Sequence, residues 1–351
     1  MMKIKSNWKT YLQYGIVIAL VGLFLYLTFE TYRLDPMGFK NRTYWEWADL
    51  LIIPIVLVIG ALYLQQSWRV VQWEIATDKQ QEVALQEYFS RMSELLLMEK
   101  LQTTDKAEVR NLARTRTVSI MRMVNKERTD LVIHFLRDVH LITDENSILN
   151  GADMRYMDLQ DLYLSETYLQ KANLQSANLK GAYLQHVNLQ KANLQDAILQ
   201  SAILTGADLQ NVNLRGADMR GVYLRAADLT STDLAGISMK DALLDGANLK
   251  GADLMAADLK GAVLAGANLQ NTLLDGADLK NADLRDADLR HANLKDANLK
   301  NAYLQHAKLK DANLEGADLQ DADLTDANLT RATMPDGTVR ISNYLHQRTY
   351  S

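Results

Sequence analysis

Residues 172–176, Ala-Asn-Leu-Gln-Ser, are one copy of a five-residue phrase that repeats without a break along the second half of the chain. A Leu or a Met stands at every fifth position from Met154 to Met334, and a small residue, mostly Ala, stands two places before it. The 37 consecutive units contain no insertion. This repeat therefore decides the fold of residues 147–337.

The five-residue period excludes the two regular secondary structures. An α-helix cannot bury this pattern, because a five-residue step turns a side chain by about 500° and spreads the leucines around the whole helix. A flat strand cannot either, since an odd period sends alternate leucines to opposite faces. A coil that turns a corner every five residues keeps both apolar positions inside. Four sides close a square, which predicts about nine coils stacked ~4.8 Å apart in a rod roughly 40 Å long.

Two parts of the chain resemble known proteins. Residues 172–176 and 282–286 (Ala-Asp-Leu-Arg-Asp) are similar to the motif of the pentapeptide-repeat family. This resemblance implies a right-handed quadrilateral β-helix, a β-solenoid, and implies no activity. Residues 85–97, 108–117 and 134–142 resemble the linker of bacterial membrane-anchored pentapeptide-repeat proteins. That resemblance implies a location and an architecture rather than a chemistry.

Two apolar runs precede the linker and predict a membrane anchor. The first, residues 11–29, is uncharged and would span ~28 Å as a helix, while the second, residues 50–64, is shorter. We expect a transmembrane helical hairpin in residues 1–68, and a cleaved signal peptide is the alternative for the first run. Five Lys and Arg flank the hairpin against three in its loop, which favours both termini and the β-helix in the cytoplasm of a bacterial inner membrane.

The remaining ranges are assigned from their patterns. Residues 69–146 are expected to form a cytoplasmic helical linker and cap, with apolar residues at three- and four-residue steps over 85–96. This spacing suits packing on the same chain and on a second copy equally well. The last linker helix is expected to bury Leu131. Pro335-Asp-Gly337 ends the repeat with turn chemistry. Residues 338–351 are then a C-terminal tail.

Composition and spacing predict no catalytic or metal chemistry. The chain has no Cys, and its six His stand at no ligand spacing. Repeat glycines fall mostly two residues after the Leu, at the corners, where they ease tight backbone geometry. Asp and Asn before each Leu are periodic and are therefore read as scaffold. We expect no enzyme, no cofactor, no metal and no small-molecule substrate.

One column of the coil is apolar where the equivalent columns are polar. Residues twenty apart stack on one side, and the position before the Leu is mostly Asp or Asn on three sides. On the fourth side seven of nine such residues are aromatic or aliphatic, which predicts an interface for a protein partner or a second copy. A column covered by the chain's own helices is the alternative. We call these residues the Tyr stripe: Tyr163, Tyr183, Ile203, Tyr223, Leu243, Val263 and Tyr303.

A second column is basic. Stacked like charges repel each other, which would suit an anionic partner, although neighbouring aspartates favour a solvated and internally balanced face. Nucleic acid is an unlikely partner, because the formal net charge of the chain is −5. We call this column the basic ladder: Lys180, Arg220, Lys240, Lys260, Lys280 and Lys300.

The leading hypothesis is a membrane-anchored, non-enzymatic scaffold whose rod presents the Tyr stripe to a protein partner or to a second copy. A DNA-mimicking regulator of a topoisomerase is an alternative, disfavoured because 18 bases interrupt the 25 acids of residues 147–334. An accessory subunit of a channel or transporter is another alternative.

Overall fold

A computed structural model describes the backbone of residues 44–104 and 106–340, and side chains from Val58 onwards apart from residue 105. The chain divides into two units, Met1–Thr77 and Asp78–Ser351. The four domain ranges expected from the sequence stay a prediction. Three helices are described, α2 (Tyr44–Met98), α3 (Ala107–Met123) and α4 (Lys126–Asp138), and the repeats follow them.

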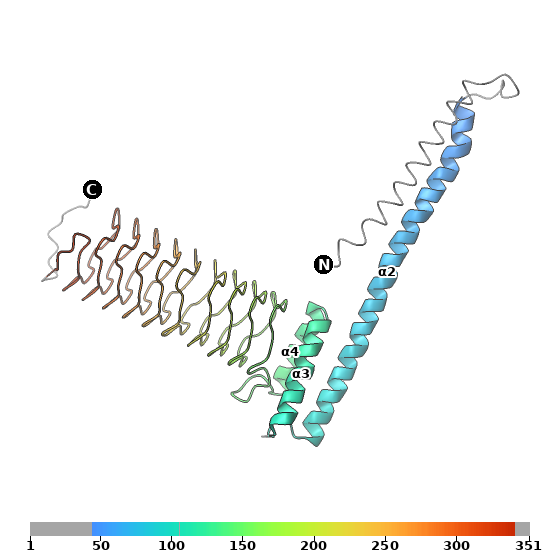
Figure 1. Ribbon diagram of the computed structural model, residues 1–351, viewed down its shortest axis with the longest axis horizontal. Helices are drawn as coiled ribbons and strands as arrows, with labels where there is room; N and C mark the ends of the chain where they lie inside the picture. The colour runs from blue at the N-terminus through green and yellow to red at the C-terminus, as the bar shows by residue number, and fades with distance from the viewer. Residues whose placement is uncertain (1–43, 105, 341–351) are drawn as a thin grey trace. The chain divides into compact units, whose positions relative to one another are not determined.

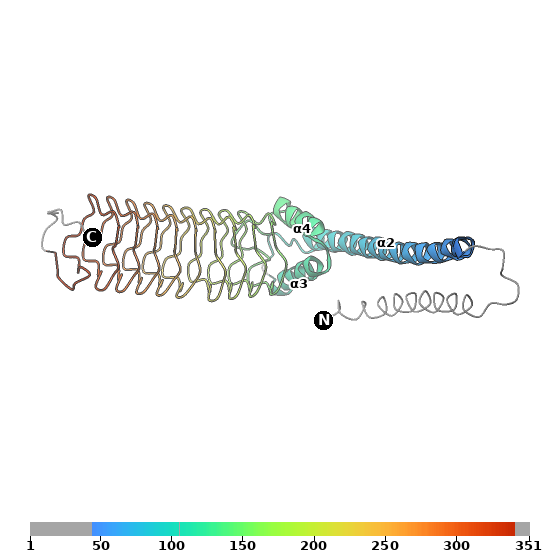
Figure 2. The ribbon, with the colours of Figure 1, turned by 90° about the horizontal axis from the view of Figure 1, so that it is seen from above.

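The repeats form a four-sided coil of twenty residues, stacked as Figure 2 shows. Parallel bridges join each residue before the Leu to the residue twenty places on, as between Asn173 and Asn193. The Leu174 amide donates to the Asn193 carbonyl at 2.7 Å, and the Asn173 amide donates to the Ala152 carbonyl at 2.8 Å. Each side contributes one bridge residue, and no longer strand forms among the described residues. The predicted β-helix is therefore confirmed.

Both apolar positions of the unit point inward. From Ala152 to Met334 nearly every Ala and Leu of the repeat is buried. Thr232 and Thr272 replace Ala and stay buried because their hydroxyls donate to the carbonyls of Leu209 and Leu249, at 3.2 and 2.9 Å. The rod is thus filled along its axis, and each coil contacts only its neighbours, as in other repeat proteins.

The corners explain the composition of the outward positions. The residue two places after the Leu has a positive φ, such as 54° at Ser176 and 66° at Gly206, in the left-handed region that Gly, Asn and Asp enter most easily. At Gly206 a Cβ would also lie 2.5 Å from Nδ1 of His186. The prediction that repeat glycines ease the corners is confirmed.

Asp or Asn before the Leu has a structural use as well. Oδ1 of Asn173 accepts a hydrogen bond from the backbone amide of Gln175 at 3.2 Å, and Oδ1 of Asn193 does the same for Gln195 at 3.2 Å. This turn, closed by a side chain on the amide two residues later, recurs along the rod. The position before the Leu therefore stabilises the corner that follows it.

The three helices pack on one another before the rod. Leu85, Tyr88, Met92 and Leu95 of α2 are buried, so the apolar stripe predicted over 85–96 packs within its own chain. The Tyr88 hydroxyl lies 2.9 Å from that of Thr117 in α3. Leu131, which we expected in the core, is 52% exposed. The core face of α4 therefore runs through Val132, Ile133 and Leu136 instead.

Both ends of the rod carry chain beyond the regular coils. At the N-terminal end, the Arg114 Nε donates to the Ile148 carbonyl and the Arg122 guanidinium donates to the Asp153 carbonyl, both at 2.9 Å. At the C-terminal end a tight turn follows Met334, as predicted, and the Thr338 amide donates to Oδ1 of Asp336 at 2.9 Å. Residues 341–351 of the predicted tail lie outside the described residues.

The predicted localisation in an inner membrane is wrong. Among the described residues no helix is both long enough and apolar enough to cross a membrane. The second predicted span, Leu50–Leu64, is not a separate element but lies within the continuous helix α2. The first predicted span, residues 11–29, lies outside the described residues.

Candidate interaction surface

The Tyr stripe forms one continuous column on one side of the coil. Parallel bridges connect Tyr163 to Tyr183 and continue rung by rung to Tyr303, with Asp283 interrupting after Val263. Its four tyrosines are 37–51% exposed, while Ile203, Leu243 and Val263 are half-buried. The first six rungs extend about 24 Å at the spacing of stacked strands. The structure therefore brings the predicted stripe residues together, and their binding role stays a prediction.

The first rungs of the stripe make contacts with each other and with α4. The Tyr163 and Tyr183 rings stack with 5.0 Å between their centroids. The guanidinium of Arg137, from α4, lies 5.8 Å from the Tyr163 ring centre and donates to the Tyr163 and Ser165 carbonyls, at 3.2 and 3.0 Å. Tyr163 nevertheless remains 48% exposed. The helices therefore contact the first rung and leave the stripe open beyond it.

The stripe departs from a rule that most units of the other columns obey. On those sides the Asp or Asn before the Leu accepts the backbone amide two residues on, as Asp253 does for Met255 at 3.0 Å. Tyr183 and Tyr223 have no oxygen there to accept the amides of Gln185 and Arg225. Seven rungs of one column thus give up a hydrogen bond that stabilises the corner. Local rules are most often broken where a surface has another use.

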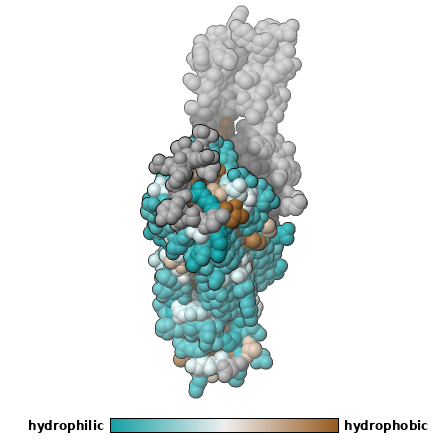
Figure 3. All heavy atoms as spheres, turned by 90° about the vertical axis from the view of Figure 1, so that its left-hand side faces the viewer, coloured by the Kyte–Doolittle hydropathy of each residue, from teal (hydrophilic) through white to brown (hydrophobic). Residues whose placement is uncertain are grey.

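The other exposed apolar residues in the same position are isolated. Ile198 is 41% exposed and lies between Asn178 and Asp218 in its column, and Leu273 is 40% exposed between polar neighbours. Figure 3 shows that the visible side of the rod is largely hydrophilic, with only scattered hydrophobic residues. Ile198 and Leu273 therefore serve as natural references for the stripe.

Half of the basic ladder is neutralised by aspartates. Arg220 pairs with Asp218 at 2.7 Å, Lys260 pairs with Asp278 at 2.8 Å and Lys300 pairs with Asp318 at 3.1 Å. Within the part of the chain that the structure describes, the other three members, Lys180, Lys240 and Lys280, have no ion pair. This arrangement supports the balanced-face interpretation over a site for an anionic partner.

Hydrogen bonds from arginines keep several carboxylates ionised, within the basic ladder and on other sides. Hydrogen bonding from the Arg155 guanidinium lowers the pKa of the Asp153 carboxyl to about 2, and Arg220 likewise lowers the pKa of Asp218 to about 2. Arg285 holds the pKa of Asp283 below its usual value. These carboxylates are ionised and paired at neutral pH, so the acids do not form the unbroken negative surface that a DNA mimic needs.

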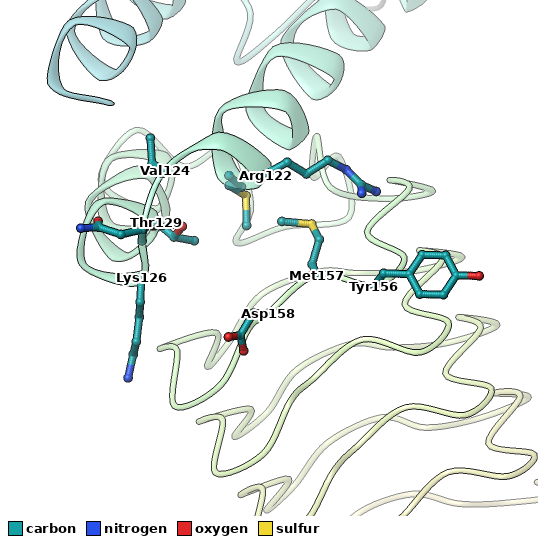
Figure 4. A pocket seen from close by; sticks show the side chains of 9 residues that line it. Arg122, Val124, Lys126, Thr129, Tyr156, Met157 and Asp158 are labelled. Carbon is teal, nitrogen blue, oxygen red and sulfur yellow. Dashed lines mark hydrogen bonds between the residues drawn. The ribbon is translucent and has the colours of Figure 1, made fainter. Parts of the chain in front are cut away.

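The main cavity lies where the turn between α3 and α4 meets the first coil. It has a volume of about 340 Å³, with Met121 and Met157 inside and Arg122, Lys126 and Asp158 at its rim. Figure 4 shows Met157 pointing toward α3 and Tyr156 pointing away. In the described residues no group of three His, Cys, Asp or Glu could hold a metal ion. The cavity carries no nucleophile with an adjacent base.

Sequence reasoning missed one residue of this surface. Arg137 reaches the stripe from another element, 26 residues before Tyr163, and no periodicity connects the two positions. The broken hydrogen-bond rule, by contrast, was visible in the sequence, because Asp and Asn are in the minority in one column only.

Solved structures with similar folds were found by comparison. The chain is similar to HetL, a pentapeptide repeat protein involved in heterocyst differentiation regulation from the cyanobacterium Nostoc sp. strain PCC 7120, with 37% identity over 54% of this chain and 86% of HetL, at a TM-score of 0.53. It is also similar to the pentapeptide repeat protein Rfr23 from the cyanobacterium Cyanothece 51142, with 34% identity over 31% of this chain and 63% of Rfr23, at a TM-score of 0.17.

A third similar structure is full-length QnrB1, a plasmid-mediated fluoroquinolone resistance protein, with 13% identity over 44% of this chain and 78% of QnrB1. Its TM-score of 0.19 is too low to carry an argument about this chain. A search of curated proteins finds no match.

The family described as "Pentapeptide repeats (8 copies)" matches residues 147–185, 182–221, 223–261, 257–296 and 297–334. Together these ranges cover more than half of the chain and coincide with the coils. The residues that match this family are the residues that form the right-handed β-helix. This chain therefore belongs to the pentapeptide repeat family.

Proposed function

We propose that this protein is a non-enzymatic interaction rod and that the Tyr stripe is its contact surface for a protein partner. The observation that carries the proposal is the loss of the corner-stabilising Asp or Asn in seven rungs of one column. Aromatic residues replace it at four of these rungs, and aromatic residues are enriched in the centres of protein interfaces.

The size of the stripe fits the core of an interface. A tyrosine side chain offers ~200 Å², so four tyrosines exposed by 37–51% present on the order of 350 Å². This matches the largest apolar patch of a typical protein, which is often functional. It is about half of the ~800 Å² that each partner buries in a standard interface. Polar neighbours such as Gln185 and Arg225 would then form the rim.

A regulatory role is supported by HetL, whose described involvement is in the regulation of differentiation. Its coils align with this rod at 37% identity. We propose that this chain likewise acts by binding a regulatory protein rather than by catalysis. No observation on the described residues favours the channel subunit. None favours the topoisomerase regulator either, because paired bases interrupt the acids, as Arg220 does beside Asp218.

The test uses substitutions that should keep the fold intact. Tyr183→Asn and Tyr223→Asn restore the corner acceptor that the other columns carry, so the double variant should fold at least as well as the native chain. Ile198→Asn makes the same change in another column and is the matched control. Each chain is crosslinked in its native cells, and its adducts are identified.

We expect the partner adduct to fall strongly in the Tyr183→Asn, Tyr223→Asn variant and to persist in Ile198→Asn. An adduct of unchanged yield in the double variant would refute the stripe as the contact surface. Equal losses in both variants would also refute it, because the effect would then not depend on the column.

A further inference from the structure

The part of α2 before the helical core has an apolar seam that no other described residue covers. Leu64, Trp68, Val71 and Ile75 follow one another at steps of four, three and four residues, and all four are 44–64% exposed. This is the spacing of the a and d positions of a coiled coil. Four large apolar side chains in water on one helix face predict a helical partner.

The same seam is already used farther along the helix. Continuing in the same steps, Leu85, Phe89, Met92 and Leu96 belong to the core that α2 forms with α3 and α4. Asp78 and Glu82 occupy the two seam positions between the stretches, and both pair with Arg128, at 2.8 and 3.5 Å. One heptad pattern is therefore buried at one end of α2 and, among the described residues, exposed at the other.

We propose that the seam of Leu64, Trp68, Val71 and Ile75 packs against the same seam of a second copy of this chain, as a short parallel coiled coil. Ile at an a position and Leu at a d position favour two strands in parallel coiled coils. Ile75 and Leu64 match this rule, whereas Trp68 at an a position and Val71 at a d position depart from it. Ala61, one step before Leu64, continues the seam without a polar break.

The charges beside the seam fit this partner. Glu74 occupies a g position, and Lys79 occupies the e position five residues later. In a parallel pair, a g residue lies beside the e residue of the next heptad on the other helix, and opposite charges there set partner choice and orientation. Among described residues, neither Glu74 nor Lys79 has an ion pair within its own chain. Two symmetry-related Glu74–Lys79 pairs would therefore form between the copies.

A second apolar face of α2 does not have the same continuity. Ile59, Tyr63, Val70 and Trp73 are exposed, but Gln66 interrupts their seam. The proposed coiled coil thus uses the face that has no polar interruption from Ala61 to Ile75. That seam is only about two heptads long, ~21 Å at the helical rise, so the dimer should be reversible. A dimer would present two Tyr stripes at once and raise avidity for a multivalent partner.

The absence of native Cys allows a direct test on the full chain by single cysteines. Val71→Cys places a thiol in the proposed seam, and Ala76→Cys places one on the same exposed helix outside both apolar faces. Under mild oxidation, Val71→Cys should give a disulfide-linked dimer several-fold faster than Ala76→Cys. Equal rates, or faster linkage through Ala76→Cys, would overturn the proposal, since the seam would then be free or covered by another segment.

A charge exchange tests the orientation in the Val71→Cys background. Glu74→Lys alone and Lys79→Glu alone should each slow linkage several-fold, because each places like charges side by side. The double exchange should restore the rate. Linkage rates that are unaffected by either single change, or a double variant as slow as the singles, would overturn the parallel pairing of two copies.

Discussion

The ring of Tyr163 contacts a cationic and an aromatic neighbour: the Arg137 guanidinium lies 5.8 Å from its centre, and the Tyr183 ring stacks on it at 5.0 Å with 22° between the planes. Arg137 also donates to the carbonyls of Tyr163 and Ser165. The guanidinium therefore ties α4 to the first coils through the backbone and not only through the ring.

Replacing Arg137 by Ala should loosen the first coils. Its two hydrogen bonds come from a charged donor, and such bonds contribute about 1.5–3 kcal/mol to stability. We expect faster amide exchange of Leu164 and Glu166, measured by hydrogen exchange, with the later coils unaffected. Arg155→Ala is the control, because Arg155 pairs with Asp153 of its own unit on the surface and should change little. Equal amide exchange rates of Leu164 and Glu166 in the Arg137→Ala and Arg155→Ala variants would contradict a stabilising contact between Arg137 and the first coils.

Two inward positions should differ sharply in their tolerance of Ala. Leu254 is fully buried at the Leu position, so Leu254→Ala should lower the free energy of unfolding by about 2–5 kcal/mol through lost burial and a cavity. Thr272→Ala restores the side chain that most units carry, and loses only the hydrogen bond to the Leu249 carbonyl, about 1 kcal/mol. Urea unfolding measures both. Similar losses at the two positions would argue against a filled core.

Acid should destabilise the rod between about pH 4 and pH 2. The pKa of Asp218 is about 2 in the fold, because Arg220 hydrogen-bonds its carboxylate, and about 3.9 in an unfolded chain. The folded state thus binds the proton less tightly, so this contribution is present above pH 4 and is lost as the pH falls toward 2. Asp153, with a pKa of about 2 beside Arg155, acts in the same direction.

The Arg220→Gln variant separates this effect from general acid sensitivity. Without the guanidinium the pKa of Asp218 should rise toward its ordinary value, so the variant should show a smaller loss of stability on acidification than the native chain. Urea unfolding at a series of pH values measures the difference. If the free energy of unfolding falls equally with pH in the native chain and in Arg220→Gln, the Asp218–Arg220 pair contributes nothing to the acid sensitivity.

The repeat made most of the fold predictable. Because Leu and Ala recur at a step that helices and flat strands cannot bury, the coil, its corners and the column that contains Tyr183 follow from residue numbers alone. The contact of Arg137 did not follow, since it depends on how α4 packs against the first coil. The exposure of Leu131 did not follow either, because two faces of α4 carry apolar residues and packing selects one.

The largest error came from hydropathy read without its structural context. The apolar residues 50–64 predict a span with its own ends, but the helix that contains them runs from Tyr44 to Met98. The apolar steps at Leu64, Trp68 and Val71 belong to the same heptad pattern as Leu85. Their period, rather than their mean hydropathy, indicates what that part of the helix contacts.

The twenty-residue coil makes the rod sensitive to the length of any deletion. Excising a whole coil would shorten the rod and leave Tyr303 in line with Tyr183, since both sides of the junction keep their phase. Excising a single five-residue unit would preserve the buried core equally well, yet would turn every later side chain by a quarter of the circumference. An insertion or deletion therefore keeps the outward side-chain columns aligned only when it comprises four five-residue units, which make one whole coil.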